Sequence, residues 1–185
     1  DRIVNQIVEY ARPRELAPVR FDLSDLIHEV VKTLDVPLQA KHLAIQAAVS
    51  PMAAHVHADR DQIKQVLLNL LLNALDAMPN GNGVIQIRTR VLPQAGRTAW
   101  VQLEVEDEGC GIAPDHLEHI FDPFFTTKHT NSASDGSGLG LTTAHQIVRE
   151  HGGTLLVESR VGAGSTFSVN LPAPDARTTV SAARE

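Results

Sequence analysis

Two segments with strong alternation of apolar and polar residues, 84–91 and 99–107, stand out along this chain. Alternation of this kind predicts strands, and the polar connection between the two segments predicts a hairpin with a long loop. Residues 154–159 and 165–171 predict a second pair of strands joined by a glycine-containing turn. We therefore expect a sheet made from hairpins, and not a strict alternation of strands and helices.

The rest of the chain combines short strands with helices. Apolar residues at helical spacing predict helices from Asp22 or Ser24 to about Gln39, from Asp59 to about Met78, and from about Leu139 to His151. Asp59 and Gln62 resemble a capping box. Short strands are expected at 21–23, 43–49 and 55–57. This mixture predicts a two-layer α/β sandwich, with one mixed sheet and helices on one face.

Length and composition fit one domain with short extensions, since the 185 residues are 43% hydrophobic and 21% charged. We expect a helix end at 1–13, a linker at 14–20, the domain at 21–172 and a disordered tail at 173–185. The net charge of −6 argues against a nucleic-acid or membrane surface as partner. One cysteine excludes an internal disulfide and indicates a cytoplasmic domain, whose larger parent protein can itself be anchored in the inner membrane.

The predicted long helix carries two asparagines among apolar residues, in the segment 65–77 (QVLLNLLLNALDA). Asn69 and Asn73 are four residues apart and share one helix face. Their amide oxygens could point into a cavity, and a hard cation such as Mg²⁺ accepts oxygen ligands of this kind. Taken alone, the pair also fits the solvent-facing side of an amphipathic helix, which is the commoner role of asparagine.

An acidic residue and two glycines follow the second predicted strand, in the segment 107–112 (DEGCGI). Gly109 and Gly111 let the backbone turn tightly, so that a flat ligand can come close. The Asp107 carboxylate accepts hydrogen bonds only, and would select a donating ligand edge such as the exocyclic amine of adenine. The alternative is an ordinary Asp-Gly turn. Cys110, between the two glycines, is expected to be a small packed side chain rather than a nucleophile.

A glycine-rich loop runs directly into the last predicted helix, in the segment 136–141 (GSGLGL). Such a loop offers backbone N–H groups and a helix N-terminus to phosphates, but this one lacks the Gly-Lys-Ser/Thr ending of a Walker loop. Upstream, the segment 121–128 (FDPFFTTK) holds three of the five phenylalanines. This cluster either anchors a mobile lid or only pins a surface loop. The segment 164–167 (GSTF) is an entry to the last strand that could be a plain hairpin turn.

The order of these segments resembles the GHKL superfamily of ATPases and kinases, and the sensor histidine kinases in particular, over residues 20–172. Residues 69–77, 107–112, 121–125 and 136–141 match its N, G1, F and G2 boxes. The resemblance implies the GHKL (Bergerat) fold, an ATP lid, and a site for ATP and Mg²⁺. The segments 73–77 and 126–128 are similar to the nitrogen-regulation branch, and residues 10–13 resemble the end of a second dimerisation helix.

The resemblance also implies roles for single residues. Asn73 would coordinate Mg²⁺, Asp107 would receive the adenine amino group, and Thr166 would approach Asp107. Catalysis would involve Asn73 and Lys128. The implied ATP-binding residues are Asn69, Asn73, Asp76, Asp107, Gly109, Gly111, Ile112, Phe121, Phe125, Thr127, Lys128, Gly136, Ser137, Gly138, Leu139, Gly140, Leu141 and Thr166.

One position separates the kinases of this superfamily from its hydrolases. The hydrolases place a glutamate four residues before the metal-binding asparagine, where this chain has Asn69. An amide cannot act as a general base, so phosphotransfer is expected rather than hydrolysis. Many histidine kinases also carry a basic residue at the position of Asp76, and we expect Lys128 to supply that charge here. Lys128→Ala should then slow phosphotransfer and leave ADP affinity nearly intact.

None of the nine histidines matches the family's phosphoacceptor box. His28 precedes Glu29, but it lacks the proline of that box and is expected to be a surface helix residue. The acceptor is therefore expected on dimerisation helices outside this chain, in a homodimer that passes the phosphate to a response regulator receiver domain. The alternative is a GHKL ATPase, or a nucleotide-gated binding module without kinase activity.

Overall fold

The computed structural model describes residues 16–79, 81–93, 99–127 and 137–174. The predictions for 1–13 and for 175–185 lie outside these residues, as do those for Lys128 and Gly136. None of the helices that the structure describes combines the length and the apolar character needed to cross a membrane.

The main sheet has five strands in the order β2-β4-β5-β7-β6. These are β2 (Leu43–Ala48), β4 (Gly83–Leu92), β5 (Trp100–Asp107), β6 (Thr154–Arg160) and β7 (Gly164–Pro172). β2 pairs with β4 in parallel, and the other neighbours are antiparallel. The mixed sheet and both predicted hairpins are therefore confirmed.

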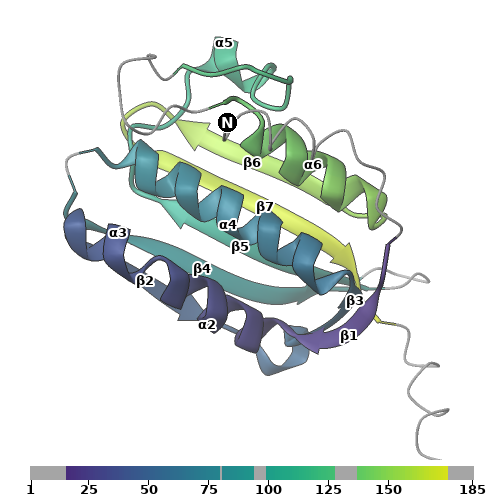
Figure 1. Cartoon of the computed structure of the whole chain (residues 1–185). Helices are drawn as coiled ribbons and strands as arrows, with labels where there is room; N and C mark the ends of the chain where they lie inside the picture. The colour runs from purple at the N-terminus through teal and green to yellow at the C-terminus, as the bar shows by residue number, and fades with distance from the viewer. Residues whose placement is uncertain (1–15, 80, 94–98, 128–136, 175–185) are drawn as a thin grey trace, which may run out of the picture.

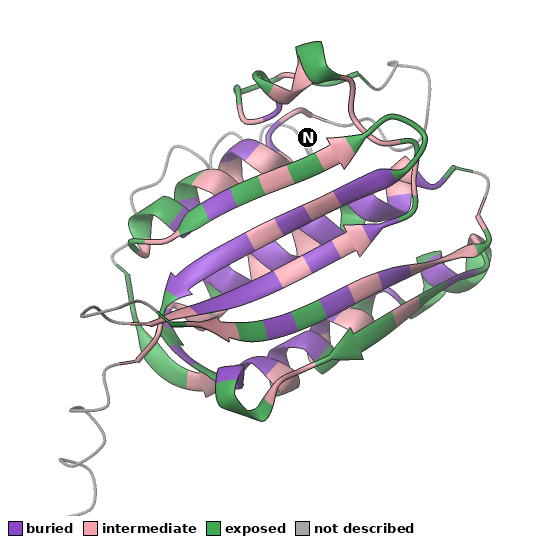
Figure 2. Ribbon diagram, turned by 180° about the vertical axis from the view of Figure 1, so that it is seen from behind, coloured by how far each residue is buried: buried purple, intermediate pink, exposed green. Residues whose placement is uncertain are grey.

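Apart from one short helix at the edge, the helices of the described chain lie on one face of this sheet (Figure 1), and the opposite face shows bare strands (Figure 2). The two-layer α/β sandwich is thus confirmed. The helical segments are α2 (Leu23–Thr33), α3 (Asp35–Ala40), the 3₁₀ turn η1 (Pro51–Ala53), α4 (Arg60–Ala77), α5 (Pro114–Leu117) and α6 (Gly140–Glu150).

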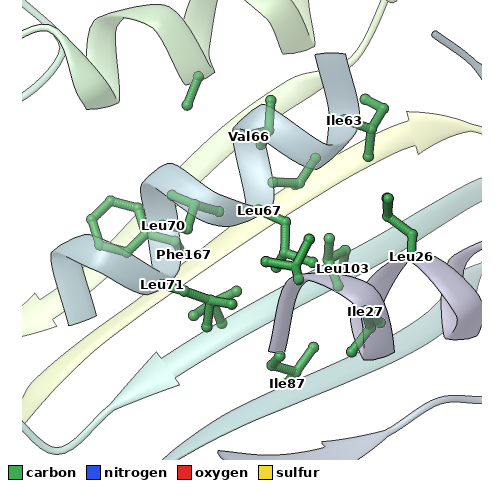
Figure 3. Packing of buried hydrophobic residues seen from close by; sticks show 14 of the residues in the cluster. Leu26, Ile27, Ile63, Val66, Leu67, Leu70, Leu71, Ile87, Leu103 and Phe167 are labelled. Atoms are coloured by element: carbon green, nitrogen blue, oxygen red, sulfur yellow. The ribbon is translucent and has the colours of Figure 1, made fainter. Parts of the chain in front are cut away.

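The core lies between α4 and the sheet. α4 is the middle helix and packs between α2 and α6. Leu67, Leu70 and Leu71 of α4 are fully buried. They meet residues of α2 and of the sheet, among them Ile27 and Leu103 (Figure 3). Burying each such side chain contributes about 1.5–3 kcal/mol, so this packing holds the polar residues of α4 in place.

Three details differ from the prediction. The helix expected to reach Gln39 is interrupted at Leu34, because Pro37 lacks an N–H and its ring would clash with the carbonyl four residues earlier. The short strands β1 (Val19–Asp22) and β3 (His55–Ala58) form a separate antiparallel pair rather than joining the main sheet. The short helix α5 lies between the segments 107–112 and 121–128, and it is not among the helices predicted above.

The start of α4 is held by more than the predicted capping box. Asp59 Oδ1 accepts from the Gln62 N–H at 3.2 Å, as expected for a cap. In a capping box, the Gln62 side chain would accept from the Asp59 N–H. Here the Asp59 N–H donates to His151 Nε2 instead, at 3.0 Å. His151 Nδ1 lies 2.8 Å from the Ile147 carbonyl and donates to it. His151 therefore joins the end of α6 to the start of α4.

Candidate nucleotide site

The two asparagines of α4 lie half-buried on the same side of the helix and have different surroundings. Asn69 Nδ2 donates to the Gly140 carbonyl at 3.0 Å, which ties α4 to the first residue of α6. Asn73 Nδ2 is buried and has no hydrogen-bond partner among the described residues. Asp76 lies one turn further along the helix and is half-buried. The structure thus brings the predicted N and G2 boxes together.

The unpartnered Asn73 amide fits a site that is completed by a ligand. A buried polar group without a partner costs about 1–3 kcal/mol, so a residue of this kind gains from binding. The described residues contain no cluster of three or more histidine, cysteine or acidic side chains that could hold a metal ion. The unpartnered Nδ2 donor fits an acceptor such as a phosphate oxygen, and the oxygen of the same amide is the kind of ligand that Mg²⁺ uses beside substrate phosphates and water.

Asp107 ends β5 as a buried carboxylate, with 4% of its surface exposed. Its Oδ1 accepts from the Gly109 N–H at 2.8 Å. Burial raises the pKa of Asp107 above its usual value, and backbone hydrogen bonds from Gly109 and Ser165 oppose that rise. Ionised Asp107 is thus a fixed acceptor that fits a donating ligand edge.

The turn after Asp107 is pinned between the end of α4 and the β6–β7 turn. The Cys110 N–H donates to the Ala77 carbonyl at 2.9 Å, which caps the last turn of α4. A Cβ on Gly109 would lie 2.6 Å from the Ala77 oxygen. Gly111 has φ +69°, and a Cβ there would lie 2.1 Å from the Arg160 oxygen. Close backbone contacts therefore require glycine at both positions. Cys110 is exposed, so the prediction of a packed side chain is wrong.

The expectation that Thr166 approaches Asp107 is wrong. Ser165 is the register partner of Asp107, whereas Thr166 is opposite Glu106. Successive side chains of a strand point to opposite faces, so Thr166 lies on the outer face of the sheet and Ser165 on the inner one. Ser165 is buried and was not among the predicted site residues. The alternation of β7 carries a signal for Ser165. Phe167, two residues away, is apolar, so Ser165 is expected on the same inner face of the strand.

Phe124 and Gly138, which flank the predicted lid, lie in contact with each other. The Phe124 N–H donates to the Gly138 carbonyl at 3.1 Å. Gly138 has φ +67°, and a Cβ there would lie 2.5 Å from the Phe124 carbonyl carbon. Phe121 stacks on His145 of α6, with ring centroids 4.7 Å apart. Phe125 contacts the rings of two histidines. The aromatic cluster thus pins this segment at its base.

The remaining predicted site residues surround these contacts. Leu139 is buried, Leu141 and Ile112 pack against the core, and the Ser137 hydroxyl accepts from the Leu139 N–H at 3.4 Å. Thr127 is exposed. Lys41 was missed: its ammonium donates to the Leu75 carbonyl at 2.6 Å. A cation fits there, since the last turn of α4 has no basic residue of its own.

The sequence model described as "Histidine kinase-, DNA gyrase B-, and HSP90-like ATPase" matches residues 58–175. The sensor histidine kinase ZraS of Escherichia coli K12 is 38% identical over 172 residues, which cover 93% of this chain and 35% of that protein. The chain thus spans about a third of the length of this relative.

Two solved structures have the same fold. Full-length ShkA in complex with AMPPNP aligns with a TM-score of 0.74 and 29% identity, over 92% of this chain and 35% of that one. Histidine kinase ThkA in complex with the response regulator protein TrrA aligns with a TM-score of 0.74 and 32% identity, over 94% of this chain and 47% of that one.

Proposed function

This chain belongs to the family of histidine kinase-, DNA gyrase B- and HSP90-like ATPases, as a catalytic domain of the sensor histidine kinase type, and we propose that it binds Mg-ATP and transfers the γ-phosphate to a histidine on another domain. The adenine amino group would donate to Asp107, and the Asn73 amide oxygen would be a ligand of Mg²⁺. Mg²⁺, if held there by Asn73, would supply positive charge to offset the charge of the phosphates.

The observation that carries transfer over hydrolysis is the Asn69 amide. It is bound to the Gly140 carbonyl at 3.0 Å, so it acts as a donor and a link between two helices. An amide has no basic site with which to deprotonate water. Attack by water therefore lacks a base at this position, and positioning of an imidazole acceptor is left as the favoured route.

The partners in this proposal lie outside the chain. They are the histidine-bearing dimerisation helices of the longer protein, as a homodimer, and a response regulator receiver domain. The negative net charge of −6 supports protein partners over nucleic acid or an anionic membrane. A domain on the cytoplasmic side, where ATP is available, fits this role. Lys128 would supply positive charge to the phosphates in place of Asp76.

The test is transfer of radiolabelled phosphate from γ-labelled ATP to a separately supplied dimerisation hairpin of the longer protein. We expect label on the hairpin histidine with this chain, and on the order of 100-fold less with Asp107→Asn, because the adenine edge loses its acceptor. Steady release of free phosphate without labelling of the hairpin would contradict the proposal and favour an ATPase. The Lys128→Ala variant tests its role in the same assay, with ADP affinity as the control.

A further inference from the structure

A row of polar side chains crosses three strands beside the candidate adenine site. Asp107 of β5 is paired with Ser165 of β7, and Ser165 is paired with Ser159 of β6. Directly opposed residues of neighbouring strands point to the same face, so the three side chains are neighbours on the inner face of the sheet. Two of them, Asp107 and Ser165, are buried. Ser159 lies outside the four predicted boxes, which are at 69–77, 107–112, 121–125 and 136–141.

The Ser159 hydroxyl has three partners. It accepts from the Ile112 N–H at 2.8 Å. It lies 2.9 Å from the Gly164 carbonyl and 2.9 Å from the Ser165 hydroxyl. Ile112 is at the end of the turn after β5, and Gly164 and Ser165 begin β7. One hydroxyl therefore joins this turn to the start of β7.

The proton count of this network determines the direction of the Ser165 hydroxyl. Ser159 has one proton, and the Gly164 carbonyl can only accept, so that proton is used in the bond to Gly164. The Ser165 hydroxyl must then donate to Ser159. Ser165 keeps only lone pairs for a ligand. Beside it, the ionised Asp107 carboxylate is also an acceptor.

We propose that Ser159 is a positioning residue that turns the Ser165 hydroxyl into an acceptor and thereby selects a base with an exocyclic amine over one with a carbonyl at the same place. This inference rests on the proposed adenine site at Asp107. Two adjacent acceptors match the two hydrogens of an amino group. A carbonyl oxygen would face two acceptors, and a site with unmatched polar groups rejects a ligand strongly.

ADP and inosine diphosphate test this selection, because their bases present an amine and a carbonyl at the same position. Both would be titrated calorimetrically into the unaltered chain and into Ser159→Ala. Removal of the Ser159 hydroxyl lets the Ser165 hydroxyl rotate and donate to the carbonyl. We expect the ratio of ADP to inosine diphosphate affinity to fall about three- to tenfold, which corresponds to one hydrogen bond.

Three further variants separate positioning from a merely structural role. Ser159→Thr keeps a hydroxyl and should restore the ratio, and Ser165→Ala should lower ADP affinity more than inosine diphosphate affinity. Ser168→Ala, on the outer face of β7, is the matched control and should leave the ratio unchanged. Equal losses for both nucleotides in Ser159→Ala, or an unchanged ratio, would overturn the inference. Failure of the unaltered chain to bind ADP would instead overturn the proposed function, and this inference with it.

Discussion

The two ends of the candidate site differ in how completely the protein satisfies its own polar groups. At the base end, Asp107, Ser165 and Ser159 are all hydrogen-bonded to neighbouring strands or turns. At the phosphate end, Asn73 has a buried amide nitrogen without a partner in the described chain. In the proposed site, the base end would therefore be formed before a ligand arrives, and the phosphate end would be completed by the ligand.

The difference follows from the elements that build each end. Strand register fixes the base end, because paired residues of β5, β7 and β6 cannot shift singly. The phosphate end is made from one helix face and from the base of the segment between Phe124 and Gly138. The comparison predicts that changes at the two ends affect different parts of the nucleotide.

The largest effect is expected for Asn73→Ala. Loss of the amide oxygen removes the proposed ligand of Mg²⁺, so transfer to the supplied hairpin should fall by about 100-fold or more. The free energy of unfolding should stay within about 1 kcal/mol, because the variant also removes a buried donor without a partner. Transfer assays and denaturant titration measure the two quantities.

Asn69→Ala is the matched control for this variant. It removes the bond to the Gly140 carbonyl, so the free energy of unfolding should fall by about 0.5–1.5 kcal/mol. If Asn73→Ala destabilised the domain more than Asn69→Ala, the proposed difference between the two asparagines would be contradicted.

The next largest effect is expected for Gly138→Ala. The new Cβ would lie 2.5 Å from the Phe124 carbonyl carbon, at a φ of +67°, so the base of the lid segment must move. Strain of about 1–3 kcal/mol should weaken Mg-ATP binding about tenfold and leave adenosine binding unchanged. Gly162→Ala, in the turn between β6 and β7, is the control, because Gly162 has a similar φ of +77° and its Cβ would meet nothing within 4 Å. Equal losses for adenosine and Mg-ATP would show that the two ends are not separable.

A smaller effect is expected from pH. Burial raises the pKa of Asp107, and a protonated carboxyl donates where the adenine amine needs an acceptor. ADP affinity should thus decrease as the pH falls toward this raised pKa. Titrations from pH 8 to pH 5 measure the decrease. Asp107→Asn, which has no proton to gain, should bind weakly and equally at each pH.

The smallest effect is expected for Glu29→Gln, far from the site. Hydrogen bonds from Lys64 and Arg60, both at 2.5 Å, lower the pKa of Glu29 to about 2. The lowered pKa means that Glu29 stabilises the fold above its ordinary pKa of 4.5 and loses this effect as the pH falls toward about 2. The thermal midpoint of Glu29→Gln should therefore be slightly lower at pH 7 and converge with that of the unaltered chain in acid. Because the group is exposed, high salt should also shrink the difference.

Much of the fold could be predicted from local patterns. The alternation in β4, β5, β6 and β7 and the helical spacing of α4 and α6 are set by burial on one face, which the sequence displays directly. The separate pairing of β1 with β3 could not be predicted, since strand partners depend on contacts distant in the chain. Pro37 did carry a local signal for the break at Leu34.

The site was predicted unevenly for the same reason. Asp107, Gly109 and Gly111 occupy a short segment whose residue types indicate a tight turn and an acceptor, and the structure shows both. The partners of that turn come from elsewhere, as with Ser159 and Lys41, and neither has a distinctive neighbourhood in the sequence. The roles of the residues toward ATP and Mg²⁺ stay predictions.

The most direct test of a preformed base end is calorimetric titration of ADP into this chain with and without Mg²⁺, alongside Asp107→Asn. We predict saturable ADP binding without Mg²⁺, a gain in affinity when Mg²⁺ is added, and loss of both in the variant. Binding that requires Mg²⁺ and persists in Asp107→Asn would show that the phosphate end alone holds the nucleotide, and would contradict the account.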